Sequence, residues 1–354
     1  MSVLSLNERK NYSILDIAKL ICAILIVSAH FASETASFPQ IIDYAFSVYV
    51  IAVPFFFCCS GFLFFDKLKS LQTREQKREY FVKYQKRIWT MYGLWTLVYL
   101  PFIIISWIRK GPEAWTRILK WLHTSLVFQT YSTIWFLPAL AVGVAIGYFA
   151  FSRLKKVPMI IIVAVLYLLG TFGYSYSFIF EGTVVERIYD VYLLIFKTTR
   201  NGLFNAFPFI YIGYVFANKS EASIKKNFTK ASLLTALCFL LIVVESFVLK
   251  LKFGVTGMDF IIALVPFTYF LMETLLGFKL KERNLYIVFR KLSLLIFVSQ
   301  RLFLSALPSV MPSVFAVLYS NSYLGLLIVM MLTVGFSLAI YSLSKKLPFL
   351  KRFM

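Results

Sequence analysis

Runs of about 20 apolar residues recur along the whole chain, and they constrain its fold more than any other feature. Of the 354 residues, 60% are hydrophobic and only 15% are charged. A helix of about 20 apolar residues spans the hydrocarbon core of a bilayer, and soluble domains do not have this composition. We therefore predict an all-α, polytopic integral membrane bundle of about ten transmembrane helices. The predicted spans are residues 14–33, 43–65, 88–108, 134–151, 158–178, 202–217, 230–249, 258–277, 292–307 and 323–343.

The Lys and Arg residues between these spans indicate how the chain is oriented. If both termini are cytoplasmic, the inner segments carry 26 Lys and Arg residues, and the outer segments 109–123, 181–200 and 250–253 carry nine. An excess of positive charge on the cytoplasmic side is typical of membrane proteins. We predict an N-in, C-in protein in a bacterial plasma membrane, in contact with the lipid bilayer. The net charge of +21 follows from this bias, so no nucleic-acid partner is expected.

The chain is predicted to form one transmembrane domain, residues 1–354, with no soluble domain. The first span is too long for a cleaved signal peptide and lacks a small-residue cleavage pattern, so we expect it to be retained. No Cys-x-x-Cys spacing occurs, and no metal site is predicted. The four cysteines all lie inside apolar runs: Cys22, Cys58, Cys59 and Cys238.

The first predicted helix contains three ionisable side chains, Asp16, Lys19 and His30. Ionisable groups are costly inside a bilayer, so they indicate a functional site by default. Lys19 and His30 are eleven residues apart. On an α-helix they lie within about 20° of the same face, separated by about 16 Å along the axis. One face of this helix therefore links the inner side of the membrane to its outer third.

Each of these side chains has a functional and a structural interpretation. His30 could act as a general base, because imidazole accepts a proton near neutral pH, and Glu34, four residues later, could orient it. Alternatively, His30 could form a hydrogen bond to a neighbouring helix. Lys19 could bind an anion, or it could only pair with Asp16, three residues before it.

Residues 15–30, with the sequence LDIAKLICAILIVSAH, resemble the opening of acyltransferase family 3. Members of this family usually have Asp-x-x-Arg, then ten residues, then His. Asp16 and His30 occupy the first and last of these positions, and Lys19 stands where the family usually has Arg. An ammonium group keeps the charge but lacks the planar fork with which Arg binds phosphate or carboxylate.

Four further motifs resemble this family in the same order along the chain. They comprise a Ser-Gly-Phe element in the second span, a basic pair before the third, a Trp-Phe-Leu at the fourth and a central Phe-Pro-Phe. Their positions here are Ser60-Gly61-Phe62, Lys83 with Arg87, Trp135-Phe136-Leu137, and Phe207-Pro208-Phe209 preceded by Asn201-Gly202. The family often has a His late in the chain, and this sequence has Gln300 there, followed by Arg301.

The resemblance implies an acyltransferase that uses a cytoplasmic acyl-CoA, commonly acetyl-CoA, as the donor. The acceptor would be a hydroxyl of a cell-surface glycan or a lipid-linked sugar, which makes the protein an enzyme of the cell envelope. His30, with Asp16 and Glu34, would be catalytic. Lys19, Lys83 and Arg87 would hold the polyanionic donor. The residues expected to contact the acceptor or the reacting oxygen are Ser60, Trp135, Asn201, Gln300 and Arg301.

A second function remains open from the sequence. Ionisable residues within spans also mark the substrate paths of transporters. Some members of the family are membrane domains attached to amino-acid racemases, so the alternative is a transporter of a small substrate such as serine. Against it, the two halves of the chain show no inverted repeat. A purely structural role would leave His30 unexplained.

Overall fold

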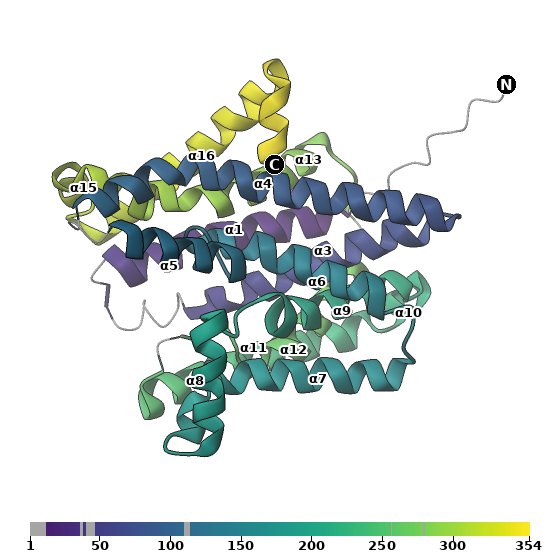
Figure 1. Ribbon diagram of the computed structural model, residues 1–354. Coiled ribbons are helices and arrows are strands. Elements are labelled where there is room, and N and C mark those ends of the chain that lie inside the picture. The colour runs from purple at the N-terminus through teal and green to yellow at the C-terminus, as the bar shows by residue number, and fades with distance from the viewer. Residues whose placement is uncertain (1–11, 36–37, 40–46, 110–113, 256, 279) are drawn as a thin grey trace.

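The computed structural model describes residues 12–35, 38–39, 47–109, 114–255, 257–278 and 280–354 (Figure 1). Within these ranges every regular element is a helix, which confirms the all-α prediction. The long helices of the first half are α1 (Ser13–Thr35), α3 (Ala52–Lys69), α4 (Arg74–Arg109), α5 (Ala114–Val127), α6 (Phe136–Ala150), α7 (Lys156–Phe172) and α8 (Val184–Phe196). Those of the second half are α9 (Phe207–Asn218), α11 (Phe228–Phe253), α12 (Leu264–Gly277), α13 (Asn284–Arg301) and α16 (Ser322–Lys346).

Short helices complete the chain. Those of 3₁₀ type are η1 (Ser47–Ile51), η2 (Ser132–Trp135), η3 (Ser177–Phe180) and η6 (Pro348–Phe353). Two are π-helices, η4 (Gly202–Ala206) and η5 (Leu302–Ala306). The remaining short α-helices are α10 (Glu221–Lys226), α14 (Leu307–Val310) and α15 (Pro312–Leu318).

Six helical segments of the described chain are long and apolar enough to cross a membrane: Ser13–Ser33, Val48–Lys69, Arg74–Arg109, Ser132–Ala150, Phe228–Phe253 and Ser322–Lys346. The other four predicted spans coincide with shorter helices, which are α7, η4 with α9, α12, and α13 with η5. The total of ten spans and the N-in, C-in orientation stay predictions.

Helices α3 and α9 pack at the centre of the bundle, and two glycines allow their close approach. A Cβ atom on Gly61 would lie 2.7 Å from the carbonyl oxygen of Ile210. A Cβ atom on Gly213 would overlap the backbone of Cys58 and Phe62. Because the missing side chains let the two backbones touch, α3 and α9 form a rigid support for the helices around them.

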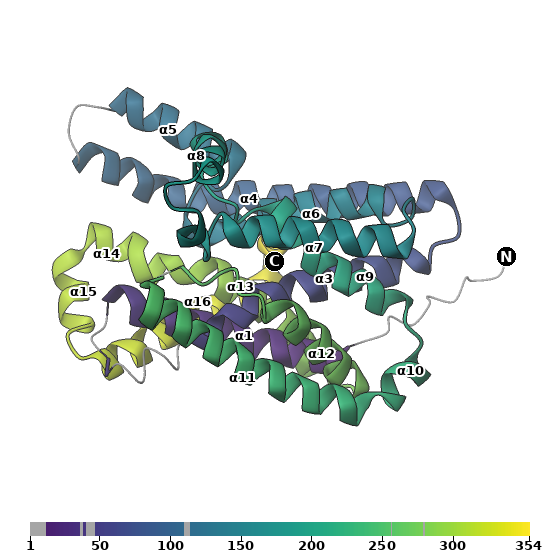
Figure 2. The ribbon, with the colours of Figure 1, turned by 90° about the horizontal axis from the view of Figure 1, so that it is seen from below.

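Helix α1 lies against α13, α16 and α3, inside the bundle rather than at its edge (Figures 1 and 2). Helices α11 and α16 are more peripheral, since only 22% of the apolar window of each is buried. Their exposed Leu, Val and Met side chains suit contact with lipid. Helix α8 runs across the direction of α7, at the same end of the bundle as the last turn of α1 (Figure 1).

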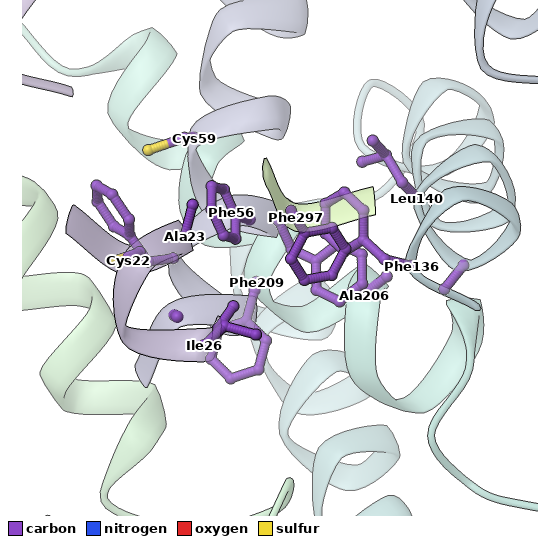
Figure 3. Close-up of a cluster of buried hydrophobic side chains, with 14 of the residues drawn as sticks. Cys22, Ala23, Ile26, Phe56, Cys59, Phe136, Leu140, Ala206, Phe209 and Phe297 are labelled. Atoms are coloured by element: carbon purple, nitrogen blue, oxygen red, sulfur yellow. The ribbon is translucent and has the colours of Figure 1, made fainter. Parts of the chain in front are cut away.

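An apolar cluster fills the bundle at the middle of α1 (Figure 3). Phe56, Phe136 and Phe297 come from three different helices, and their ring centroids lie 5.2–6.0 Å apart. Ile26 of α1 and Phe209 of α9 belong to the same cluster, and all five side chains are buried. We call this group the middle cluster. It separates the two polar ends of α1.

Candidate active site

The imidazole of His30 forms a hydrogen bond to a helix far away in the sequence. Its Nδ1 atom lies 3.0 Å from Oε1 of Gln300, which belongs to α13. The Gln300 side chain is completely buried, and its Nε2 donates to the carbonyl oxygen of Phe297 at 2.9 Å. The histidine predicted from the first helix and the glutamine predicted from the late motif therefore meet in the structure.

Charged and aromatic side chains surround this pair. The ring of Tyr49, in η1, lies 5.8 Å from the His30 ring between centroids. Three charged residues are close enough to His30 to interact with it electrostatically: Arg301, Arg200 and Asp259. We call His30, Gln300, Arg301, Tyr49, Arg200 and Asp259 the outer cluster. It brings together residues from α1, η1, α13 and the segments that precede η4 and α12.

Arg200 is held in the outer cluster by an ion pair and by aromatic faces. Its Nη1 lies 2.8 Å from Oδ2 of Asp259, and the hydroxyl of Tyr174 donates to the same oxygen at 2.9 Å. The guanidinium carbon lies 4.8 Å from the ring centroid of Trp135 and 5.6 Å from that of Phe128. Cation–π contacts of this kind fix the plane of the guanidinium.

Both π-helices begin beside the outer cluster. η5 follows Arg301 directly, and η4 follows Asn201 directly. π-helical turns are rare, and they are frequent at functional sites. The carbonyl oxygen of the Asn201 side chain accepts hydrogen bonds from the backbone N–H groups of Leu203 and Phe204 and so caps η4. Its amide nitrogen donates to the hydroxyl of Tyr192 at 2.7 Å.

The N-terminal end of α1, which is predicted to lie on the inner side of the membrane, carries a second group of charges. Asp16, which is 2% exposed, accepts hydrogen bonds from Nε and Nη2 of Arg290 at 2.8–3.1 Å. Nζ of Lys19 lies 2.8 Å from the other face of the same carboxylate, at Oδ1. One acidic group therefore balances two cations here, and the net charge stays positive.

More positive charge lies beside Arg290. Burial lowers the pKa of Lys291, and the charges of three neighbouring cations lower it further; these are Arg87, Lys351 and Arg290. Lys83, one turn before Arg87 on α4, is exposed. We call Asp16, Lys19, Arg290, Lys291, Arg87 and Lys351 the inner cluster. It joins α1, α13, α4 and η6.

A pocket of about 390 Å³ opens next to the inner cluster. The pair of Asp16 and Arg290 forms one of its walls, and the segment leading into α13 forms another, with Arg283, Asn284 and Tyr286. Ser13 also lines a second pocket of about 370 Å³, which lies between α1, α3, α10 and α12. Lys69, Lys219 and Lys225 line it together with Asp66 and Glu221. Either pocket has room for part of a nucleotide.

The structure does not bring all predicted residues to His30. Asp16 lies about 21 Å from His30 along the axis of α1, so it does not contact the imidazole. Ser60 lies next to Cys59, and Cys59 interacts electrostatically with Lys19 and Cys22. Lys19 and Cys22 precede His30 by eleven and eight residues, so Ser60 lies nearer to the level of Lys19 on α1 than to that of His30. Trp135 and Arg301 lie in or beside the outer cluster. The side chain of Glu34, in the last turn of α1, is outside the described part of the chain.

Six residues of these clusters were not predicted as site residues: Tyr49, Arg200, Asp259, Arg290, Lys291 and Lys351. Arg290 and Lys291 lie in a stretch that resembles an ordinary cytoplasmic loop, and its positive charge is explained by topology alone. Arg200 pairs with Asp259 across 59 residues of sequence, and a single sequence holds no signal for such a pairing. In the described ranges, no three His, Cys, Asp or Glu side chains are grouped as metal ligands would be.

Two known proteins resemble part of the chain. An amino-acid racemase of Enterococcus faecalis is 30% identical over 240 residues, which cover 66% of this chain and 32% of the relative. A serine/alanine racemase of Enterococcus gallinarum is 24% identical over 264 residues, which cover 74% of this chain and 36% of the relative. The chain thus spans about a third of the length of these relatives. No solved structure matches it significantly.

A profile of the acyltransferase domain family matches residues 12–342, nearly the whole chain. The matched range contains the outer cluster and all of the inner cluster except Lys351. The chain therefore belongs to acyltransferase family 3.

Proposed function

We propose that this protein transfers an acyl group, in the simplest case acetyl, from a cytoplasmic acyl-CoA to a hydroxyl of a cell-surface glycan or lipid-linked sugar. The observation that carries the proposal is the placement of His30. Its imidazole lies at the outer end of α1, hydrogen-bonded through one ring nitrogen to Gln300. A neutral imidazole in this position can take a proton from an acceptor hydroxyl at neutral pH.

The proposed reaction is direct acyl transfer. His30 accepts the hydroxyl proton while the acceptor oxygen attacks the thioester carbon. The new C–O bond forms, the C–S bond breaks, and the CoA thiolate leaves and takes the proton back from His30. Negative charge develops on the carbonyl oxygen during the attack. The positive charges of Arg301 and Arg200, which act on His30 in the outer cluster, favour that charge.

The acceptor would contact buried polar atoms near Asp259. Nε of Arg200 and Oδ1 of Asn205 have no hydrogen-bond partner among the described residues. A hydroxyl group can accept from the first and donate to the second. The Arg200 guanidinium already lies over the ring of the buried Trp135, so we expect Arg200, rather than Trp135, to contact the sugar.

The inner cluster supports binding of the donor. Acyl-CoA carries several phosphate charges, and cations next to a low-dielectric wall attract phosphate strongly. Lys291 and Arg87 lie together at this end, and Lys19 lies on the same helix as His30. The extended arm of the donor would have to cross the distance of about 16 Å between Lys19 and His30, and the apolar side chains of the middle cluster would have to move apart to admit it.

The test compares two histidine variants. The chain has two histidines, and His123 lies in α5, outside the outer cluster. We expect His30→Ala to abolish transfer of labelled acetyl from acetyl-CoA to the cell-envelope fraction of membranes that contain the protein, because the base is lost. His123→Ala, the matched control, should keep the activity. Retained transfer in folded His30→Ala protein would reject His30 as the base.

A further inference from the structure

Gln300 is oriented by the protein backbone rather than by His30. Its amide nitrogen donates to the carbonyl oxygen of Phe297, one turn earlier in α13. A backbone carbonyl only accepts hydrogen bonds, so the atom facing it must be the nitrogen of the amide. The other amide atom, Oε1, is therefore the one that faces His30 at 3.0 Å.

This orientation determines which nitrogen of His30 carries the hydrogen. An amide oxygen only accepts hydrogen bonds, so Nδ1 of His30 must be the donor in this contact. In a neutral imidazole the second nitrogen then has a free lone pair. Within the described part of the chain, no other side chain or backbone group forms a hydrogen bond with the His30 ring.

We infer that Gln300 is a positioning residue: it holds His30 in the tautomer protonated at Nδ1, so that Nε2 is the atom that accepts the proton. The role of Nε2 as a base rests on the proposed function; the tautomer itself rests only on the two hydrogen bonds of Gln300. Gln300 does not touch the reacting atoms. It acts through the imidazole, because the hydrogen bond at one ring nitrogen decides which of the two nitrogens carries the hydrogen.

The other groups around His30 do not replace Gln300. The ring of Tyr49 from η1 lies 5.8 Å from the His30 ring between centroids and is tilted by 56° to it. Arg301, Arg200 and Asp259 act on His30 through their charges. Charges of this kind act on the whole ring, whereas the hydrogen bond of Gln300 is directed at one ring nitrogen, Nδ1.

The tautomer can be measured by ¹⁵N NMR of the purified full chain in detergent, labelled with ¹⁵N-histidine. With two histidines in the chain, His123→Ala assigns the His30 signals directly. In the parent protein we expect a protonated Nδ1 and an unprotonated Nε2. Gln300→Glu should keep this pattern, because a carboxylate also only accepts from Nδ1. Gln300→Met, which is similar in size and accepts hydrogen bonds only weakly, should give a mixture of tautomers.

The same variants separate positioning from a structural role in kinetics. We expect Gln300→Met to lower kcat about tenfold, equivalent to about 1.4 kcal/mol, with the KM for acetyl-CoA unchanged, because one hydrogen bond is lost at the base. Gln300→Glu should restore most of kcat. A merely structural role would not give this rescue together with the change of tautomer.

A protonated Nε2 in the parent protein would overturn the inference, even if Gln300→Met fails to fold. An unchanged tautomer in folded Gln300→Met would overturn it as well. The proposed function fails separately: a protonated Nδ1 in a protein whose His30→Ala variant still transfers acetyl would leave the tautomer assignment intact and reject the reaction.

Discussion

Asp16 interacts with cations from two distant parts of the chain. Lys19 is three residues away, and Arg290 is 274 residues away on α13. Both hydrogen bonds of the Arg290 fork end on this one carboxylate. The described contacts of Asp16 therefore tie the inner end of α1 to α13, at a distance from His30 that excludes direct contact.

We expect Asp16→Asn to lower the free energy of unfolding by on the order of 3 kcal/mol, because it leaves two cations side by side without their counter-charge. Thermal unfolding of the protein in detergent measures this as a lower Tm. The matched control is Asp66→Asn. Asp66 accepts a hydrogen bond from the neutral hydroxyl of Tyr12 at 3.0 Å, so its loss should matter less. Equal Tm values for the two variants would contradict this role for Asp16.

The sequence predicts individual site residues better than their partners. His30 was predicted from its cost inside a bilayer and from the family motif, and Gln300 from its motif position. Their contact across 270 residues was not predictable. Tyr49 and Arg200 lie outside regular α-helices, where periodicity gives no information on neighbours.

Among the elements, α3 and α9 make the closest contact, and it depends on glycine. We expect Gly213→Ala to lower the free energy of unfolding by about 1–3 kcal/mol, because the added methyl group overlaps the backbone of α3. The control is Gly93→Ala in α4, where a Cβ atom meets nothing within 4 Å. There Ala should be neutral or stabilising by about 0.5–1 kcal/mol. Thermal unfolding of both variants is the measurement.

Helix α4 extends from the basic segment into the bundle without a break, over 36 residues. Lys83 and Arg87 lie in its exposed inner part, and η6 packs on the same helix where Nε1 of Trp95 donates to the carbonyl of Phe353. The charges proposed to bind the donor thus lie on a continuous helix rather than on a loop. This favours a preformed site for phosphate.

We expect the double variant Lys83→Gln and Arg87→Gln to raise the KM for acetyl-CoA more than it lowers kcat, because these cations would bind ground and transition states alike. The stabilisation of the purified protein by acetyl-CoA in a thermal shift assay should also fall. The control is the double variant Arg74→Gln and Lys77→Gln at the start of the same helix, which removes the same number of positive charges away from the proposed donor site. An unchanged KM would remove Lys83 and Arg87 from the donor site.

Helix type was predictable along the chain, and helix length was not. Residues 158–178 and 258–277 are predicted as full spans because they are mostly apolar. The structure ends α7 at Phe172 and begins α12 at Leu264. Glu245 of α11 explains the second boundary, since its carboxylate accepts from the backbone N–H groups of Ile262 and Ala263 and holds the start of α12. A contact between separate helices is not visible in local hydropathy.

At the scale of the whole molecule, the outer and inner clusters lie at opposite ends of one helix, and the middle cluster fills the space between them. Ten residues separate Lys19 from His30, and Ser28 is the only one of them with a polar side chain. Its hydroxyl is already bonded to the carbonyl oxygen of Ile24. The described part of the chain therefore has little along this stretch of α1 that could hold water.

The lack of water-binding groups between Lys19 and His30 bears on the proton gradient of the cell. A protein with charged groups at both faces of a bilayer would drain the proton gradient if water connected them. We expect the buried rings of Phe56, Phe136 and Phe297 to keep water out of the space between the two clusters. We expect Phe297→Ala to increase the proton permeability of liposomes that contain the protein, measured with an internal pH dye. Phe349→Ala, at an exposed position of η6, should not change the proton permeability of the liposomes. A cell could then keep many copies of this protein in its membrane without losing stored energy through them.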